Sequence, residues 1–491
     1  MNGTTESNAV RALTAMNEMT GMNENPLDLL PEVLLAASAV LGLLLGAWLP
    51  RRRQWLVGAL AGAACAGGLV AAAIAATTPV ETAFGGAFAL DTLSATSRIV
   101  ILGATLLVLA LAAPRLYADP RETEFHVLLQ LSSVGALTLA GAQDLLLLAA
   151  GYLLASVPAY ALAGFRKDGP GTEAALKFYV LGAFLGVLML TGITVLLAAG
   201  RTTAYPVLRT ELAGAPTGLV AAGTLALLTG VLFKAGAVPA HFWVPDAVQG
   251  SSEPVAAFLT TIPKIGALVA FYRLAVVPLA DADLPWAGLV AVLSVASMTL
   301  GNLAAFFQQD VTRLLAYSTI SQVGYLLLPV AVAGRTDLDQ EALLYYLAGY
   351  ALTNLGAFAV VCALPGARTV DDYRGLARTR PALLAALVVC LLGLVGTPPT
   401  AVFLGKLEAF SAAFDGGYAW LAVVAAVNTV ASLFYYLRWI APAFLASGPA
   451  GGPGAMSRSA AVIAYGAATG SVVLGLLGGS VLDVLGGPPA P

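Results

Sequence analysis

Long apolar stretches separated by short polar connections make up most of this 491-residue chain. Each stretch is roughly 17 to 28 residues long, enough for a helix to cross a hydrocarbon core about 30 Å thick. The pattern therefore predicts an all-α, polytopic membrane protein with about fourteen transmembrane helices. The predicted spans are residues 32–49, 55–76, 87–113, 124–141, 143–164, 172–198, 217–240, 254–277, 284–306, 311–333, 341–364, 382–399 continuing brokenly to 413, 417–445 and 459–484.

Two of these spans, the seventh and the twelfth, are interrupted by proline. In the seventh span Pro239 follows Lys234, and in the twelfth Pro398 and Pro399 precede Lys406. Proline lacks a backbone N–H donor and clashes with the preceding turn, so both helices should break. Breaks are tolerated in lipid only where the freed backbone groups face protein or a water-filled cavity. Helices 7 and 12 are therefore predicted to be discontinuous and to line a polar site within the membrane.

The two interruptions lie five spans apart, which suggests an internal repeat. Spans 4–8 and spans 9–13 would form two five-helix units, and an odd number of helices makes such units inverted relative to each other. The predicted divisions are a disordered N-terminal extension (1–27), helices 1–3 (28–122), a first half with helices 4–8 (123–280), a second half with helices 9–13 (281–446), and helix 14 with a tail (447–491).

Composition agrees with a membrane location. Only 10% of the residues are charged and the mean hydropathy is +0.86, whereas soluble domains are about 25% charged. No cluster of basic residues with interleaved aromatics is present, so a nucleic-acid partner is not expected. Residues 1–27 are polar and lack the basic start and apolar core of a signal peptide, so we expect a disordered extension, with Met22 as an alternative start.

Basic residues are concentrated in alternate connections. Arg51, Arg52 and Arg53 follow the first span, and further Arg or Lys residues follow the third, fifth, ninth, eleventh and thirteenth spans. The opposite connections are poorer in basic residues and carry acids such as Asp281 and Asp337. Because Lys and Arg are enriched in cytoplasmic loops, the basic connections should face the cytoplasm, and both termini should lie on the outer face.

Three lysines lie inside the predicted spans: Lys234, Lys264 and Lys406. A charge at the centre of a bilayer costs roughly 3 to 10 kcal/mol or more. The alternative is that these side chains extend to the membrane surface, which is difficult for Lys264 because it lies near the middle of its span. Desolvation favours the neutral form of a lysine and a nearby carboxylate favours the charged form, so such residues can take up and release protons. We therefore expect the three lysines to form a proton relay.

Further polar residues are weaker candidates for the same site. His241 lies next to the first break, where a relay role and a structural role are equally plausible, and Gln322 lies within span ten. Glu173 and Lys177 are spaced i, i+4, which favours a structural ion pair on a helix face and leaves a relay role as the alternative. His126, at a helix entrance, is expected at the surface. Because the sequence contains no phosphate loop, nucleotide fingerprint or metal-binding cluster, no cofactor is expected in this chain.

Several long motifs resemble the antiporter-like membrane subunits of NADH–quinone oxidoreductase (respiratory complex I), and most closely the subunit N family. The most specific is FKAGAVPAHFWVPDAVQGSSEPVAAFLTTIPK, which contains Lys234 and Lys264. The other motifs are EAALKFYVLGA (173–183), MTLGNLAAFFQQDVTRLLAYSTISQVGYLLL (298–328), YYLAGYALTNLGAFAVV (345–361), DDYRGLARTRPALLA (371–385), GTPPTAVFLGK (396–406) and NTVASLFYYLR (428–438).

The resemblance implies a proton-translocating subunit of a translocase in a bacterial inner (plasma) membrane. In the family, the residues that match Lys234, Lys264 and Lys406 pass protons across the membrane. NADH, FMN, iron–sulfur clusters and quinone would be bound by partner subunits, and the direct partners would be other membrane subunits of the complex and the bilayer. The alternative that the resemblance leaves open is a subunit of an Mrp-type cation/proton antiporter or of a membrane-bound hydrogenase.

The chain departs from the family pattern at two positions. The family has a glutamate in helix 5 that pairs with the lysine of helix 7, and in the matching stretch AGYLLASVPAY (150–160) Leu153 stands in its place. A histidine that is common in helix 10 is replaced by Gln322. Neither Asp144 nor Glu408 has a spacing that would replace the missing acid. Altered or weak proton pumping through this chain is therefore the alternative to pumping as in the family.

Overall fold

The computed structural model describes residues 25–77, 80–117, 119–445 and 456–486, so most of the predicted disordered extension and the ends of the tail lie outside the described residues. The bundle helices are α2 (Leu30–Trp48), α3 (Trp55–Ala75), α4 (Thr92–Leu116), α5 (Glu122–Gly141), α6 (Leu145–Ala163), α7 (Gly169–Gly200), α9 (Thr217–Ala235), α10 (Trp243–Gly250), α11 (Glu253–Val276), α12 (Trp286–Ala305), α13 (Val311–Ala331), α14 (Asp339–Ala363), α16 (Pro381–Val395), α17 (Ala401–Asp415), α18 (Ala419–Ala443) and α19 (Arg458–Leu476). The shorter elements are η1 (Pro26–Leu29), η2 (Arg51–Arg53), β1 (Glu81–Ala83), β2 (Phe88–Leu90), α8 (Tyr205–Ala213), η3 (Val370–Tyr373), α15 (Leu376–Thr379) and α20 (Gly478–Leu485).

The all-α membrane fold predicted from the sequence is confirmed. Within the described residues, twelve helices are long and apolar enough to cross a membrane. The predicted fourth span is α5, which is more polar because its first turn carries Glu122 and Glu124. The predicted twelfth span is the pair α16 and α17, each too short to cross alone. These two additions account for the fourteen predicted spans.

Some predicted boundaries differ from the observed ones for local reasons. The third span was expected to begin at residue 87, but residues 88–90 form strand β2, which pairs antiparallel with β1. The helix begins after Asp91, whose carboxylate accepts a hydrogen bond from the backbone N–H of Ser94 while the Ser94 hydroxyl accepts one from the backbone N–H of Asp91. This capping box fixes the start of α4.

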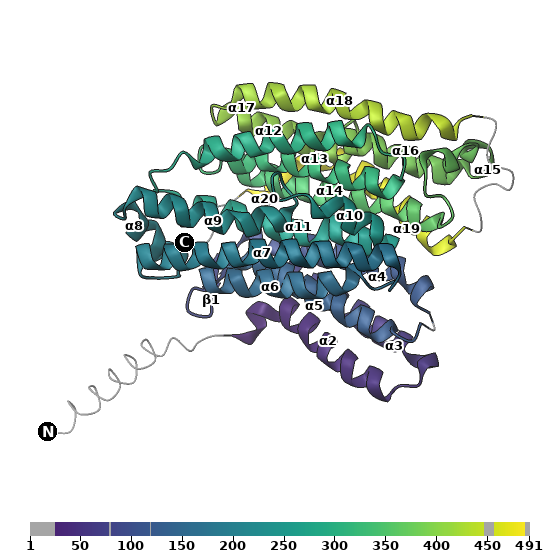
Figure 1. Cartoon of the computed structure of the whole chain (residues 1–491), viewed down its shortest axis with the longest axis horizontal. Helices are drawn as coiled ribbons and strands as arrows, with labels where there is room; N and C mark the ends of the chain where they lie inside the picture. The colour runs from purple at the N-terminus through teal and green to yellow at the C-terminus, as the bar shows by residue number, and fades with distance from the viewer. Residues whose placement is uncertain (1–24, 78–79, 118, 446–455, 487–491) are drawn as a thin grey trace.

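The membrane helices lie side by side with their long axes roughly aligned, and the N-terminal pair α2 and α3 lies at one edge of the bundle (Figure 1). Helices α5–α11 form the middle of the molecule, and α12–α18 pack above them in this view. The two sets repeat the same neighbours: α5 packs on α6 as α12 packs on α13, and α7 packs on α9 and α10 as α14 packs on α16 and α17. Helix α11 is enclosed on all sides and contacts α14 of the second set.

Both predicted helix breaks are present. Helix α9 ends at Ala235 and is followed by Gly236 with φ +75°, after which α10 begins at Trp243. Helix α16 ends at Val395 and is followed by Gly396 with φ +92°, after which α17 begins. A left-handed residue after the last turn is a common way to end a helix, and glycine adopts it without steric cost.

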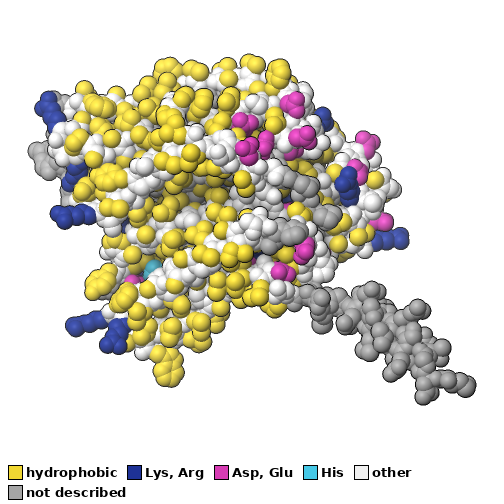
Figure 2. All heavy atoms as spheres, turned by 180° about the vertical axis from the view of Figure 1, so that it is seen from behind, with side chains coloured by type: hydrophobic (Ala, Val, Ile, Leu, Met, Phe, Trp, Pro, Cys, Tyr) yellow, Lys and Arg dark blue, Asp and Glu magenta, His cyan; other side chains and the backbone are white. Residues whose placement is uncertain are grey.

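Charged residues are distributed unequally between the two ends of the bundle. Figure 2 shows most of the visible Lys and Arg side chains at one end and most of the visible Asp and Glu side chains at the other, with a largely hydrophobic surface between them. A wide apolar surface between two polar ends is typical of a protein embedded in a bilayer.

Candidate functional site

The three lysines predicted from the sequence are all buried inside the bundle. Lys234 on α9, Lys264 on α11 and Lys406 on α17 are only 2%, 1% and 3% exposed. Each therefore needs a polar or aromatic environment within the protein, because extension to the membrane surface does not occur. Two of the lysines bind a carbonyl oxygen at the end of a half-helix, and the third does not.

Lys264 binds the end of the first half-helix. Its Nζ donates a hydrogen bond of 2.7 Å to the carbonyl oxygen of Ala235, the last residue of α9. The Nζ also lies 5.4 Å from the centre of the Trp243 ring. Carbonyl groups at a helix C-terminus lack partners within the helix and carry partial negative charge, so an ammonium group is stabilised there. The lysine thus satisfies a backbone group that the break exposes.

Lys406 makes the corresponding contact at the second break. Its Nζ donates a hydrogen bond of 2.9 Å to the carbonyl oxygen of Val395, the last residue of α16, and lies 3.8 Å from the centre of the Tyr325 ring. The side-chain amide of Gln322 donates to the preceding carbonyl, that of Leu394, at 2.7 Å. Gln322 is therefore part of this site, and Lys264 is the structural counterpart of Lys406. Lys406 lies on α17, the second part of its own broken helix, whereas Lys264 lies on α11, the next helix after the broken pair α9 and α10.

Lys234 is different because no hydrogen-bond acceptor among the described residues reaches its Nζ. The ammonium group lies 5.3 Å from the centre of the Tyr152 ring on α6. Lys264 binds the carbonyl oxygen of Ala235, the residue that follows Lys234. His241 lies in the same break, 4% exposed, and its Nδ1 also has no hydrogen-bond partner in the described part of the chain. The first break thus gathers three titratable groups.

Leu153, which occupies the place of the family's acid, does not face Lys234. It lies on the outer side of α6 with 47% exposure, whereas its neighbour Tyr152 points inward. The Tyr152 hydroxyl donates to the carbonyl oxygen of Gly182 at 3.0 Å. Helix α6 therefore presents the aromatic ring of Tyr152, and not the side chain at position 153, to Lys234.

Two hydrogen-bonded groups of buried polar residues lie between the two breaks. On α14, the side-chain amide of Asn354 donates at 3.0 Å to the hydroxyls of both Thr260 and Thr261, one turn before Lys264 on α11. The Tyr350 hydroxyl donates at 2.7 Å to the carbonyl oxygen of Thr260 and lies 3.2 Å from the hydroxyl of Thr319 on α13. These groups start at the helix that carries Lys264 and cross to the second half.

The second group of buried polar residues, Tyr346 and Gln322, lies at the second break. The Tyr346 hydroxyl donates at 2.7 Å to the side-chain oxygen of Gln322, whose amide nitrogen binds Leu394 beside Lys406. Tyr346, Tyr350 and Asn354 are spaced i, i+4, i+8, so they share one face of α14. We name these seven buried polar residues the polar bridge: Thr260, Thr261, Thr319, Gln322, Tyr346, Tyr350 and Asn354.

Glu173 and Lys177 lie at the basic end of the molecule, away from the breaks. Lys177 pairs with Glu173 at 2.7 Å and with Asp246 of α10 at 2.9 Å, and Asp246 also binds Arg313 at 2.8 Å. These residues line a surface pocket of about 410 Å³. The predicted helix-face ion pair is present, and the structure does not bring it into contact with the three buried lysines.

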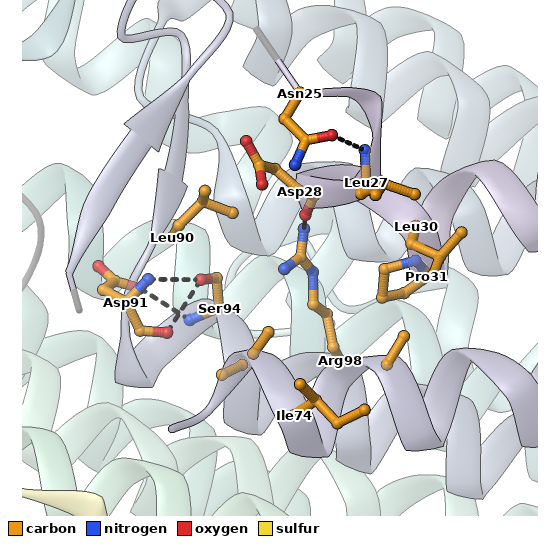
Figure 3. A pocket seen from close by; sticks show the side chains of 13 residues that line it. Asn25, Leu27, Asp28, Leu30, Pro31, Ile74, Leu90, Asp91, Ser94 and Arg98 are labelled. Atoms are coloured by element: carbon orange, nitrogen blue, oxygen red, sulfur yellow. Dashed lines mark hydrogen bonds between the residues drawn. The ribbon is translucent and has the colours of Figure 1, made fainter. Parts of the chain in front are cut away.

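Sequence reasoning missed a second set of charges within the membrane. Arg273, at the end of α11, forms a fully buried ion pair with Asp91, with contacts of 2.7 and 2.9 Å. Arg98 pairs with Glu32 at 2.8 Å and donates to the carbonyl oxygen of Asp28 beside a pocket of about 370 Å³ (Figure 3). Both arginines lie inside predicted apolar spans. A charged residue in such a span indicates a buried ion pair, so this pattern could have identified them.

The expectation that His126 lies at the surface was wrong. It is 2% exposed and packs closely on Gly58 of α3, which leaves room for the ring because it has no side chain. Within the described residues, no group of three or more His, Cys, Asp or Glu side chains is arranged to hold a metal ion.

Comparisons with known proteins identify the family. The family model described as NADH:quinone oxidoreductase/Mrp antiporter, transmembrane, matches residues 142–432. The chain is 54% identical to NADH-quinone oxidoreductase subunit N 1 of Streptomyces griseus over 95% of this chain and 98% of that protein. It is 52% identical to NADH-quinone oxidoreductase subunit N of a Mycobacterium species over 94% and 98%, respectively.

Solved structures agree with these relatives. A chain of respiratory complex I from Thermus thermophilus is 32% identical, with a TM-score of 0.81 over 93% of this chain and 100% of that chain. A chain of the Mrp complex from a Dietzia species has a TM-score of 0.84 over 94% and 96%, but its 24% identity shows a shared fold alone. The chain therefore belongs to the subunit N family of NADH-quinone oxidoreductases.

Proposed function

We propose that this chain carries protons across the membrane through Lys234, Lys264 and Lys406, as subunit N of a proton-translocating NADH–quinone oxidoreductase. The observation that carries the proposal is the polar bridge, which lies between the lysine at the first break and the lysine at the second. A proton relay needs titratable groups joined by hydrogen-bonding partners within the apolar region. Lys264 and Lys406 are such groups, and the bridge supplies buried hydroxyl and amide groups between them.

Lys234 and His241 are proposed to act at the start of the relay. Both have a nitrogen without a hydrogen-bond partner among the described residues, and a buried polar atom of this kind is usually satisfied by water. Repulsion from Lys264 favours the release of one proton when the other lysine is charged. Glu173 and Lys177 are proposed to have a structural role at the surface. Gln322 is proposed to hold the second break in place of a proton-accepting histidine.

The proposed setting follows from the family. The direct partners are other membrane subunits of the complex, and NADH, FMN, iron–sulfur clusters and quinone are bound by partner subunits, with none in this chain. The basic end of the bundle, which includes Arg51–Arg53 and Arg313, is proposed to face the cytoplasm by the positive-inside rule. Both termini are then on the outer face. The two halves are proposed to be residues 123–280 and 281–446.

The proposal is tested with Lys264→Ala and Lys234→Ala in the assembled complex. Inverted membrane vesicles from the host report NADH-driven proton uptake, and the amount of assembled complex is measured separately to normalise the rate. We expect both variants to lower uptake and leave assembly intact. Lys167→Ala is the matched control because Lys167 is an exposed loop residue at the basic end. Unchanged uptake in both relay variants would refute the proposal.

A further inference from the structure

The two half-helices end in the same way, and in each case a lysine is involved. Gly236 has φ +75° and Gly396 has φ +92°. Each glycine directly follows the residue whose carbonyl oxygen accepts the lysine: Ala235 for Lys264 and Val395 for Lys406. The two lysines come from different places in the repeat, so the common feature of the sites is the glycine.

Both glycines leave space that the lysine side chain occupies. A Cβ atom added to Gly236 would overlap Nζ of Lys264 and would lie 2.9 Å from a methyl group of Val244. A Cβ atom added to Gly396 would lie 2.9 Å from Cδ of Lys406. In both cases the nearest atom belongs to a long, flexible side chain, so the lysine rather than the backbone would move. The ammonium group would then leave the carbonyl oxygen that it binds.

We propose that Gly236 and Gly396 are positioning residues that hold the relay lysines at the ends of the two half-helices. This inference rests on the proposed function of the lysines. Each glycine acts in two ways: its left-handed conformation ends the half-helix beside a free carbonyl group, and its missing side chain lets the ammonium group reach that carbonyl. The second way is the one that concerns proton transfer, because the position of a transferring group controls the rate.

Two other glycines separate these effects. Gly334 and Gly417 have φ of +74° and +84°, close to the values of Gly236 and Gly396, but an added Cβ atom would have no neighbour within 4 Å at either position. Both lie in connections between helices. An alanine there has the same unfavourable backbone conformation without displacing a lysine, so Gly334→Ala and Gly417→Ala are matched controls.

The experiment measures NADH-driven proton uptake per assembled complex for alanine and asparagine at Gly236 and at Gly396. Asparagine tolerates the left-handed conformation better than alanine does but still adds a Cβ atom. Because a displacement of about 1 Å can cost about 100-fold in rate, we expect alanine and asparagine each to lower uptake about tenfold or more. The two control variants should keep nearly full uptake.

A double-mutant cycle links the glycine to its lysine. In the Lys264→Ala background the overlap with the ammonium group is gone and only the contact with Val244 remains, so Gly236→Ala should lower the melting temperature of the complex only slightly more than Gly334→Ala does. With Lys264 present, it should lower it further. If the Gly236 variants do not assemble, the melting temperatures of Gly396→Ala complexes with and without Lys406→Ala provide the same test.

The outcomes distinguish the two proposals. Full uptake with both Lys264→Ala and Lys234→Ala overturns the proposed function. Lys264→Ala could lower uptake while Gly236→Asn and Gly396→Asn keep full uptake. The glycines would then serve only to end the half-helices, and the positioning role would be overturned. An equal loss of melting temperature by Gly236→Ala with and without Lys264 also overturns it.

Discussion

Replacement of Tyr350 by phenylalanine should interrupt the polar bridge with little other change. The substitution removes one oxygen atom, which donates to the carbonyl oxygen of Thr260 at 2.7 Å and lies 3.2 Å from the Thr319 hydroxyl. A hydrogen bond contributes about 0.5–1.5 kcal/mol, so losing both contacts costs about 1–3 kcal/mol. Stabilities of folded proteins are about 5–15 kcal/mol, so the helix bundle should survive.

The same energy has a larger effect on the rate of proton transfer. If the lost contacts raise the barrier between the two breaks by about 1–3 kcal/mol, that step slows by about 5- to 150-fold, since each 1.36 kcal/mol is a factor of ten. The assay is NADH-driven proton uptake by inverted vesicles, normalised to assembled complex. Tyr346→Phe removes the contact with Gln322 and should behave similarly.

Tyr345 on the same helix provides the control. Its hydroxyl donates at 2.8 Å to the carbonyl oxygen of Leu474, outside the polar bridge. Tyr345→Phe loses one hydrogen bond, which costs about 0.5–1.5 kcal/mol, and should leave uptake nearly unchanged. Equal uptake in the Tyr350→Phe and Tyr345→Phe complexes would show that the hydroxyl of Tyr350 has no part in proton transfer.

Three further predictions concern the surroundings of the site. Asp91→Asn leaves Arg273 buried without its ion-pair partner, which costs about 3–5 kcal/mol; the melting temperature of the complex should fall, and an unchanged value would contradict this. Leu153→Glu should assemble normally because Leu153 is about half exposed on the outer side of α6, and loss of assembly would indicate that this face is covered by apolar groups. Lys177→Ala removes exposed ion pairs worth about 1 kcal/mol or less, so assembly and proton uptake should both be nearly unchanged; a large loss of uptake would place Lys177 in the relay.

The sequence predicted the spans and the breaks because both depend on local properties. A run of apolar residues makes a membrane helix wherever it packs. Prolines close to a glycine mark the two breaks, whereas single prolines such as Pro158 and Pro263 lie inside unbroken helices. The position of Lys264 near the middle of its span, and those of Lys234 and Lys406 beside the breaks, followed from the same pattern. The short flanking elements were not predicted because they depend on single contacts, such as the capping box of Asp91 and Ser94.

The contacts of the site could not be predicted because they depend on how each helix is rotated about its axis. Helix α6 is apolar all around, so the sequence does not indicate that Tyr152 faces Lys234 and Leu153 faces outward. The partner of Lys264 is a carbonyl group on another helix, and a backbone acceptor has no sequence signature. The pairing of Arg273 with Asp91 joins residues far apart in the chain.

The most direct test of the relay is the number of protons moved per electron in closed vesicles that contain the Lys264→Ala, Lys406→Ala double variant. This ratio does not depend on the amount of complex or on the rate of electron transfer. If protons cross this chain through the two helix breaks, the ratio should be lower than that of the unmodified complex while NADH oxidation by quinone is still measurable. An unchanged ratio would contradict the account.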